Sequence, residues 1–168
     1  MSAPFRPGLG MAGAFEYRQA EEIRDAFVRR GVRYLFLGKS GMILLGFPDT
    51  TQDADVYVEK SPENGQAIVR ALVDIGFTLA DVEAQEIIHG KDFVQLKNGP
   101  FDLDLVFAPD GIERFADAWS RRVTVEGFEV CHPDDIIASK VAANRVKDRE
   151  SLGRLRLFRD YWVATRLG

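Results

Sequence analysis

The sequence of 168 residues predicts a single α/β (α+β) domain, in which helices flank one mixed β-sheet. Three observations lead to this fold class. Segments with helical and with strand periodicity alternate along the whole chain, without an internal repeat or a long linker. Hairpin-like pairs of strands exclude a purely parallel sheet. The composition, 46% hydrophobic and 29% charged, is that of an ordinary globular domain. We expect a flexible lead-in at 1–14, followed by one domain at 15–168.

The first part of the chain predicts two helices and two strands. Residues 15–30 form an amphipathic helix that Gly31 ends. The apolar run at 33–37 is a strand, and a short helix follows at 40–45. The second strand is DADVYV at 53–58, where apolar residues alternate with polar ones.

The middle of the chain begins with a clear helix start, a serine cap at Ser61 followed by proline. We expect that helix to run from residue 62 to about residue 74. Runs at 84–88 and 93–96 are predicted as strands. The segment FDLDLVF at 101–107 alternates strictly and predicts another strand.

The last part of the chain is predicted to be mainly helical. A helix opens at residue 110 and runs through residue 119. Two short strands follow at 123–125 and 128–131. The C-terminal helices occupy about 133–166, and they are separated near Asn144.

Bulk properties exclude several classes of protein. The formal net charge is −4 and the isoelectric point is about 5.3, so net charge does not indicate a general nucleic-acid coat protein. The single cysteine, Cys131, forms no intrachain disulfide, as expected in a reducing compartment. The sequence has neither the ~18 apolar residues of a membrane span nor the pattern of a signal peptide. We therefore expect a cytoplasmic protein.

Two of the predicted strands each carry an Asp-x-Asp pair, Asp53/Asp55 and Asp102/Asp104. Side chains two residues apart on a strand share a face, so each pair places two carboxylates together. Aspartate is depleted in strands, and like charges this close repel unless a cation lies between them. Mg²⁺ suits such a site, because it is usually held by a few carboxylates plus substrate phosphates. A solvated strand face is the simpler alternative.

The segment before the first pair reads LFLGKSGMILLGFPDTTQDADVYV. A strand ends in Gly38 and a short helix follows, so free backbone N–H groups at the helix start can bind phosphate. The letters GKS also occur in phosphate loops of P-loop NTPases, but that motif needs a glycine where this chain has Arg33. The P-loop interpretation is therefore rejected.

The ordered set of motifs resembles the DNA-polymerase-β-like nucleotidyltransferase superfamily, and within it small bacterial single-domain members related to AbiEii-type proteins. The residues that carry the resemblance are Gly38, Gly46, Pro48, Thr51, Asp53 and Asp55, with FDLDLVF and APDG downstream. The likeness spans about 32–152 and implies the nucleotidyltransferase fold with C-terminal helices.

The resemblance implies a site and a reaction. Asp53 and Asp55 would hold Mg²⁺ (or Mn²⁺), and Asp104, rather than Asp102, would be the third metal-binding and catalytic carboxylate. The nucleotide, ATP or another NTP, would be bound by Gly38, Lys39, Ser40, Thr51 and Lys140. The enzyme would move a nucleoside monophosphate to a hydroxyl of RNA, protein or a small molecule, with release of pyrophosphate.

Two departures from the family pattern keep an alternative open. Lys39 stands where the family has a second small residue, and Asp49 where relatives often carry a basic one. They favour a degenerate protein that binds nucleotide or a partner without turnover, as a defence or toxin–antitoxin component.

The C-terminal helices are locally basic and could contact an RNA or protein acceptor, or could simply be solvated. An apolar stripe on the last helix could pack on the domain, on a second copy in a homodimer or on a partner protein. Its members are Leu152, Leu155, Phe158 and Trp162.

Overall fold

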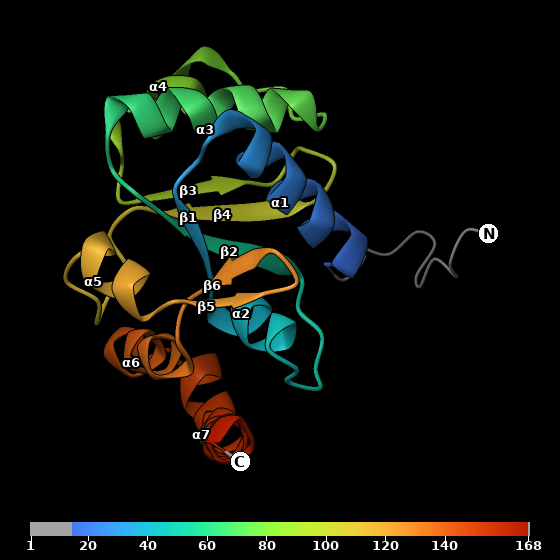
Figure 1. Ribbon diagram of the computed structural model, residues 1–168. Helices are drawn as coiled ribbons and strands as arrows, with labels where there is room; N and C mark the ends of the chain where they lie inside the picture. Colours follow the sequence, from blue (N-terminus) through green and yellow to red (C-terminus); the bar gives the residue numbers. More distant parts are fainter. Residues whose placement is uncertain (1–14, 168) are drawn as a thin grey trace.

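A computed structural model of the protein describes residues 15–167 and shows a six-stranded mixed sheet with helices on both sides (Figure 1). The fold class predicted from the sequence is therefore confirmed. The lead-in expected at 1–14 lies outside the described residues.

The helices and strands follow one another closely along the chain. The helices are α1 (Tyr17–Arg30), α2 (Gly38–Leu44), α3 (Pro62–Asp74), α4 (Asp81–His89), α5 (Phe115–Arg121), α6 (Pro133–Ala143) and α7 (Val146–Leu167). The strands are β1 (Tyr34–Leu37), β2 (Asp53–Val58), β3 (Phe93–Leu96), β4 (Asp102–Val106), β5 (Val123–Val125) and β6 (Phe128–Val130).

The sheet has the strand order β3-β4-β2-β1-β6-β5. β2 pairs with β4 and β1 pairs with β6 in parallel, whereas the other three pairings are antiparallel. The two strands that carry the Asp-x-Asp pairs, β2 and β4, are therefore parallel neighbours, and both lie inside the sheet.

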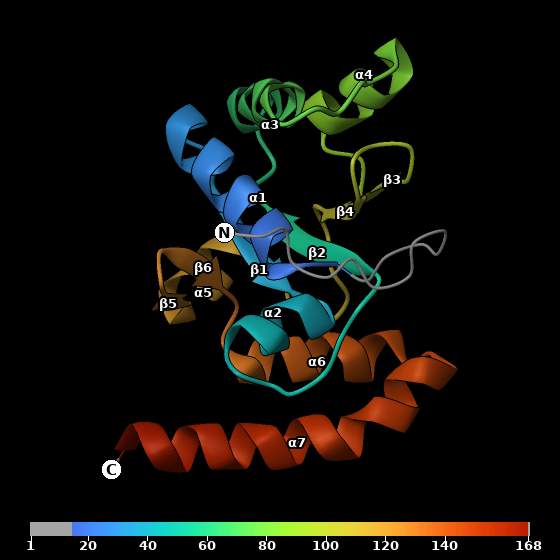
Figure 2. The same cartoon turned by 90° about the vertical axis from the view of Figure 1, so that its right-hand side faces the viewer.

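Two groups of helices enclose the sheet (Figures 1 and 2). α1, α3 and α4 lie on one side, and α2, α6 and α7 on the other, with α7 outermost. The predicted apolar face of α1 is buried, and its members are Ala20, Ile23, Ala26 and Phe27. Within residues 15–167 no helix is long and apolar enough to cross a membrane.

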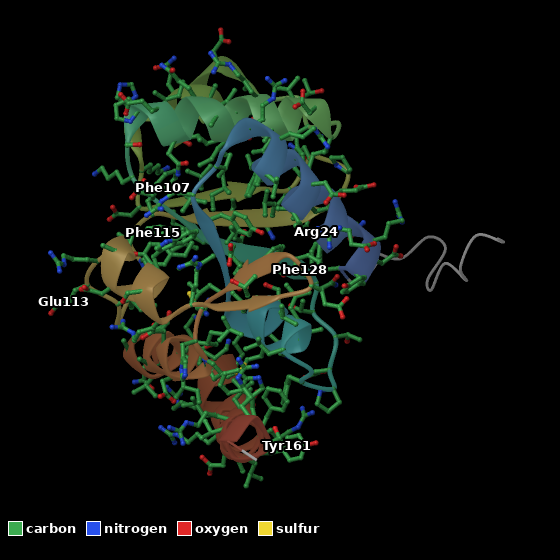
Figure 3. All side chains as sticks on the ribbon, in the orientation of Figure 1. Arg24, Phe107, Glu113, Phe115, Phe128 and Tyr161 are labelled. Atoms are coloured by element: carbon green, nitrogen blue, oxygen red, sulfur yellow. The ribbon has the colours of Figure 1, made fainter. Side chains whose placement is uncertain are left out.

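Aromatic contacts join the helices to both faces of the sheet. In Figure 3, Arg24 of α1 lies beside Phe128 of β6, with the guanidinium carbon 4.8 Å from the ring centroid. On the other face, Phe115 of α5 packs edge-on against Tyr57 of β2, with the ring centroids 5.0 Å apart. Since Tyr57 shares its face with Asp53 and Asp55, α5 covers this face next to the aspartates.

The strand predicted at 84–88 is wrong, because this segment belongs to helix α4. The Glu83 side chain accepts a hydrogen bond from the Ala80 N–H at 2.9 Å, which satisfies a free donor at the helix start. Gly90 ends the helix with a φ of +71°. Only Ile87 of this helix is buried, so its apolar residues do not mark a strand that is buried on both sides.

The helix predicted to open at Asp110 begins later, at Phe115. Gly111 has a φ of +79°, which a right-handed helix cannot accommodate. A Cβ built on Gly111 would lie 2.5 Å from the carbonyl oxygen of Ala138, so the loop runs hard against α6. The chain between β4 and α5 therefore forms a loop with a turn at Asp110–Gly111 before it becomes helical.

The apolar stripe of α7 packs on the same chain. Leu155 is fully buried, and the Phe158 ring lies 5.5 Å from that of Phe47, centroid to centroid. The stripe therefore fixes the last helix to the loop after α2. Leu157 and Tyr161 face away, and Figure 3 shows Tyr161 at the outer edge of the molecule.

Candidate active site between the aspartate strands

The parallel pairing of β2 and β4 brings the two Asp-x-Asp pairs side by side. Asp53 is in register with Asp102, and Asp55 with Asp104. All four side chains point to the same face of the sheet, because they occupy alternating positions of paired strands. A local pattern in two distant segments thus becomes one cluster through the sheet pairing.

Asp104 is the most constrained carboxyl of this cluster. Its side chain is only 6% exposed, and its Oδ1 atom is buried without a hydrogen-bond partner. Burial, together with the charge of Asp55, raises the pKa of Asp104 to about 8. Asp104 lines the same cleft as Asp53 and Asp55, whereas Asp102 does not. Of the two candidates on β4, only Asp104 is thus placed for chemistry.

Gly38 lies against the carboxylate of Asp55. Its φ is +62°, and a Cβ at this position would collide with Oδ2 of Asp55. A side chain is therefore excluded for two independent reasons, backbone conformation and space. Burial and the neighbouring charge of Asp53 raise the pKa of Asp55. The glycine turn predicted to approach phosphate also presses on a carboxylate.

Ser40 is buried and stabilises the site without lining the cleft. Its side chain is 2% exposed, and its hydroxyl donates to the Leu37 carbonyl at 2.9 Å. The same oxygen accepts the backbone N–H of Asp55 at 3.0 Å. The hydroxyl expected to bind nucleotide therefore joins the start of α2 to β2 and fixes Asp55.

The other expected site residues line one cleft with a volume of about 430 Å³, within the range of small-molecule sites. They are Gly38, Lys39, Thr51, Asp53, Asp55, Asp104 and Lys140. The order of the strands sets the arrangement of this cleft. The start of α2 follows β1, the aspartates lie on β2 and β4, and β3 forms the far edge.

The cations of the cleft come from helices, and we call these four residues the helical wall. They are Lys39 of α2, Lys140 of α6, Arg145 between α6 and α7, and Lys147 of α7. The fields of Lys140 and Lys147 act on Asp55, and that of Arg145 acts on both Asp55 and Asp104. Positive charge thus faces the aspartates across the cleft.

A buried carboxylate holds part of the helical wall in place. Asp148 is fully buried and accepts from Arg145 Nε at 2.8 Å and from Lys140 Nζ at 3.4 Å. Burial alone would raise the pKa of Asp148, but the hydrogen bonds from Arg145 bring this pKa below its usual value. Burial lowers the pKa of Lys140, against the opposing charges of Asp148 and Asp55. Asp148 therefore orients two cations at the mouth of the cleft.

Lys39 and Asp49, the two departures from the family pattern, form an ion pair with each other. Lys39 Nζ lies 3.3 Å from Asp49 Oδ2, and the same oxygen lies 3.3 Å from Arg154 Nη1 of α7. A hydrogen bond from the Thr50 N–H, followed by the contact with Lys39, lowers the pKa of Asp49. The unusual lysine is therefore held by the unusual aspartate.

The opposite side of the cleft carries acids and an aromatic ring, and we call it the strand wall. Its members are Asp92, Phe93, Val106, Ala108, Pro109 and Asp110. Phe93 opposes Val106 in the sheet and is 44% exposed, which is unusual for a large apolar side chain on a strand. The neighbouring cations Lys91 and Arg114 pair with Glu86 and Asp117 instead of with Asp92 and Asp110.

The carboxylates suit a divalent cation as a partial site. The buried, unpartnered Oδ1 of Asp104 beside Asp55 is an oxygen that lacks a positive partner. Among the described residues, no three carboxylate, histidine or cysteine side chains are arranged to hold a metal by themselves. The three aspartates expected to bind metal are therefore not a complete metal site by themselves. Mg²⁺ is commonly bound through one or two carboxylates together with substrate phosphates and water, so such a site would be completed by the nucleotide.

Sequence reasoning did not identify the strand wall or the buried Asp148. Phe93 looked like an ordinary strand residue, and a spacing argument cannot show that its face is the one with the aspartates. Asp148 stood among basic residues and looked like one member of a solvated charge pattern. A pairing of β3 with β4 in the right register would have been needed to place Phe93 near Asp104.

Comparison with known proteins supports the fold. No family model matches the sequence, and no curated protein does. The structure is similar to the crystal structure of TM1012, a candidate nucleotidyltransferase from Thermotoga maritima, with a TM-score of 0.53 and 17% sequence identity. The match covers 82% of this chain and 89% of that chain. At this identity the likeness shows the fold alone, and that fold is nucleotidyltransferase-like.

Proposed function

We propose that the protein is a Mg²⁺-dependent nucleotidyltransferase that moves a nucleoside monophosphate from an NTP to an acceptor hydroxyl. The observation that carries this proposal is the three-part cleft, with Gly38 pressed on Asp55, Asp104 beside it and cations opposite. Carboxylates alone would suit many kinds of site. Carboxylates that face cations suit a phosphate chain whose charge the cations would neutralise from one side and a carboxylate-held metal from the other. The fold shared with TM1012 agrees with this function.

The helical wall and the aspartates of the cleft have separate roles in this reaction. The helical wall and the N–H groups at the start of α2 bind the triphosphate. Asp55 and Asp104, with Asp53 on the same face of β2, would hold the metal together with phosphate oxygens, and the metal would supply charge neutralisation at the transferred phosphoryl group. The acceptor oxygen bonds to the α-phosphorus while the bond to the β-phosphate bridge breaks, and pyrophosphate leaves. The Asp104 carboxylate accepts the hydroxyl proton.

Nucleotide binding without turnover is the second candidate, and the ion pair between Lys39 and Asp49 favours it. An ammonium group neutralised by Asp49 and shared with Arg154 is less available to a phosphate. As part of this second candidate, we propose a role in a defence or toxin–antitoxin pair. The relation to AbiEii-type proteins is likewise a proposal.

Transfer of label from each α-³²P NTP in the presence of Mg²⁺ tests the proposal. The acceptors are total RNA, the protein itself and a mixture of small hydroxyl compounds. We expect transfer that is lost in an Asp53→Ala/Asp55→Ala variant and kept in Asp102→Asn, which alters an aspartate outside the cleft. The loss should be at least the roughly 10²–10³-fold that one electrostatic group contributes. Nucleotide binding without transfer would favour the second candidate. If the protein showed neither binding nor transfer, the site assignment itself would be rejected.

A further inference from the structure

The strand wall has a composition that a phosphate chain would avoid. Its lining includes two exposed acidic residues, Asp92 and Asp110, and the exposed Phe93. None of its six members is a cation, whereas the four cations that line the cleft all lie on the opposite side. The two walls therefore attract ligands of opposite charge.

The chemistry of transfer assigns an acceptor to one of these walls. In an in-line displacement, the attacking oxygen and the leaving oxygen lie on opposite sides of the phosphorus. The sheet order places Asp55 and Asp104 between the start of α2 and β3. If pyrophosphate leaves towards α2 and the helical wall, the acceptor hydroxyl arrives from the strand wall.

We propose that the strand wall binds the acceptor, and that this acceptor is a small hydroxyl compound with a positive charge and a flat apolar face, not a polyanion. The inference rests on the proposed nucleotidyl transfer and specifies the acceptor of that reaction. Phe93 stacks on the flat face, and Asp92 and Asp110 attract the charge. Asp104, which lines the same cleft and has a buried carboxyl oxygen without a partner, accepts the proton of the hydroxyl.

The register of the sheet supports this placement. Phe93 opposes Val106, which lies two residues beyond Asp104 on the same face of β4. The positions of Phe93 and Asp104 in the sheet are therefore about one strand spacing and two residues apart, roughly 8 Å. A single small molecule can thus place its ring near Phe93 and its hydroxyl towards Asp104.

Three phenols of similar size test the charge preference directly. Tyramine, tyrosol and 4-hydroxyphenylacetate share a phenol ring and differ in a cationic, neutral or anionic tail. Their dissociation constants are measured by NMR titration, with and without a non-hydrolysable ATP analogue and Mg²⁺. We expect tyramine to bind roughly tenfold more tightly than 4-hydroxyphenylacetate, since each exposed carboxylate contributes only modestly in water.

Variants separate charge from stacking. Asp92→Asn/Asp110→Asn should bring the three probes within about twofold of one another, because the two charges are the cause of the ranking. Phe93→Ala should weaken all three by a similar factor, roughly two- to tenfold. The matched control, Asp81→Asn/Glu113→Gln, removes two exposed acids outside both walls, and Figure 3 shows Glu113 pointing into solvent. It should leave the ranking intact.

Each result decides the acceptor independently of the reaction. A preference for the anion, competition by oligo(U) RNA, binding of none of the probes, or a ranking unchanged in Asp92→Asn/Asp110→Asn would overturn the assignment. Loss of nucleotide binding with the charge ranking kept would instead reject nucleotidyl transfer and leave a cation-preferring site. Label transferred to RNA in the turnover assay would support the function and reject this acceptor.

Discussion

The two walls of the cleft differ both in charge and in how their charged groups are held. On the helical wall, Lys140 and Arg145 are fixed by the fully buried Asp148. On the strand wall, Asp92 and Asp110 are exposed, and the nearby cations Lys91 and Arg114 pair with other acids. One wall is preorganised, as the binding of an invariant triphosphate requires. The other is open, as recognition of a particular acceptor allows.

Among the single substitutions, the one at Gly38 between these walls is expected to have the largest effect. In Gly38→Ala, the new Cβ would collide with the Asp55 carboxylate and the positive φ would be strained. We expect turnover to fall by up to ~10²-fold, because small displacements of reacting groups cost that much. Steady-state label transfer measures this effect.

Gly31→Ala is the matched control for that variant. Gly31 has a similar φ of +68°, but a Cβ there would meet no atom within 4 Å. Both variants should lose about 1–2 kcal/mol of unfolding free energy to backbone strain, measured by urea denaturation. An equal loss of turnover in both would show that strain, and not the contact with Asp55, matters at Gly38.

Asp104 sharpens the comparison through the pH dependence of stability. Its pKa is about 8 in the folded protein and ~3.9 in an unfolded chain, so the folded state binds more protons between these values. The melting temperature should therefore fall as the pH rises from about 4 to about 8, and then level off. Asp104→Asn should show a smaller fall, since the raised pKa of Asp55 still contributes, and it should be several degrees more stable at pH 8 without metal.

Calorimetry in EDTA measures this difference, with Asp102→Asn as the control. Asp102 occupies the same strand outside the cleft, so its replacement should keep the wild-type pH dependence. If the melting temperature of Asp104→Asn changed with pH in parallel with that of the wild type, the pKa of Asp104 would not be raised in the folded protein.

The smallest effect is expected at the ion pair on the helical wall. Asp49→Asn removes the partner of Lys39, and exposed ion pairs contribute only about 0–1 kcal/mol. The affinity for ATP, measured by calorimetric titration, should rise by roughly two- to fivefold because the ammonium is free to meet phosphate. The double variant Lys39→Gln/Asp49→Asn should lose this gain. A weaker affinity in Asp49→Asn would show that Asp49 positions Lys39 for the nucleotide.

The sequence predicted one wall of the cleft better than the other. Alternation placed each aspartate pair on one face, and the glycine turn before α2 was visible because glycine and helix-start signals are local. The strand at 84–88 was mispredicted although the cap between Ala80 and Glu83 and the stop at Gly90 are local helix signals. The helix start at Asp110 was mispredicted because the contact of Gly111 with α6 decided it. The strand wall depends on the β3–β4 register, and the pairing of Lys39 with Asp49 on a loop conformation. Neither is encoded in a local pattern.

The most direct test of the whole account is a crystal structure with Mn²⁺ and a non-hydrolysable NTP analogue. We predict an anomalous peak between the carboxylates of Asp55 and Asp104, and triphosphate oxygens within hydrogen-bonding distance of Lys39 or Lys140. The strand wall would remain open beside Phe93. Phosphates against Asp92 and Asp110, or an analogue bound outside the cleft, would contradict the assignment of the two walls.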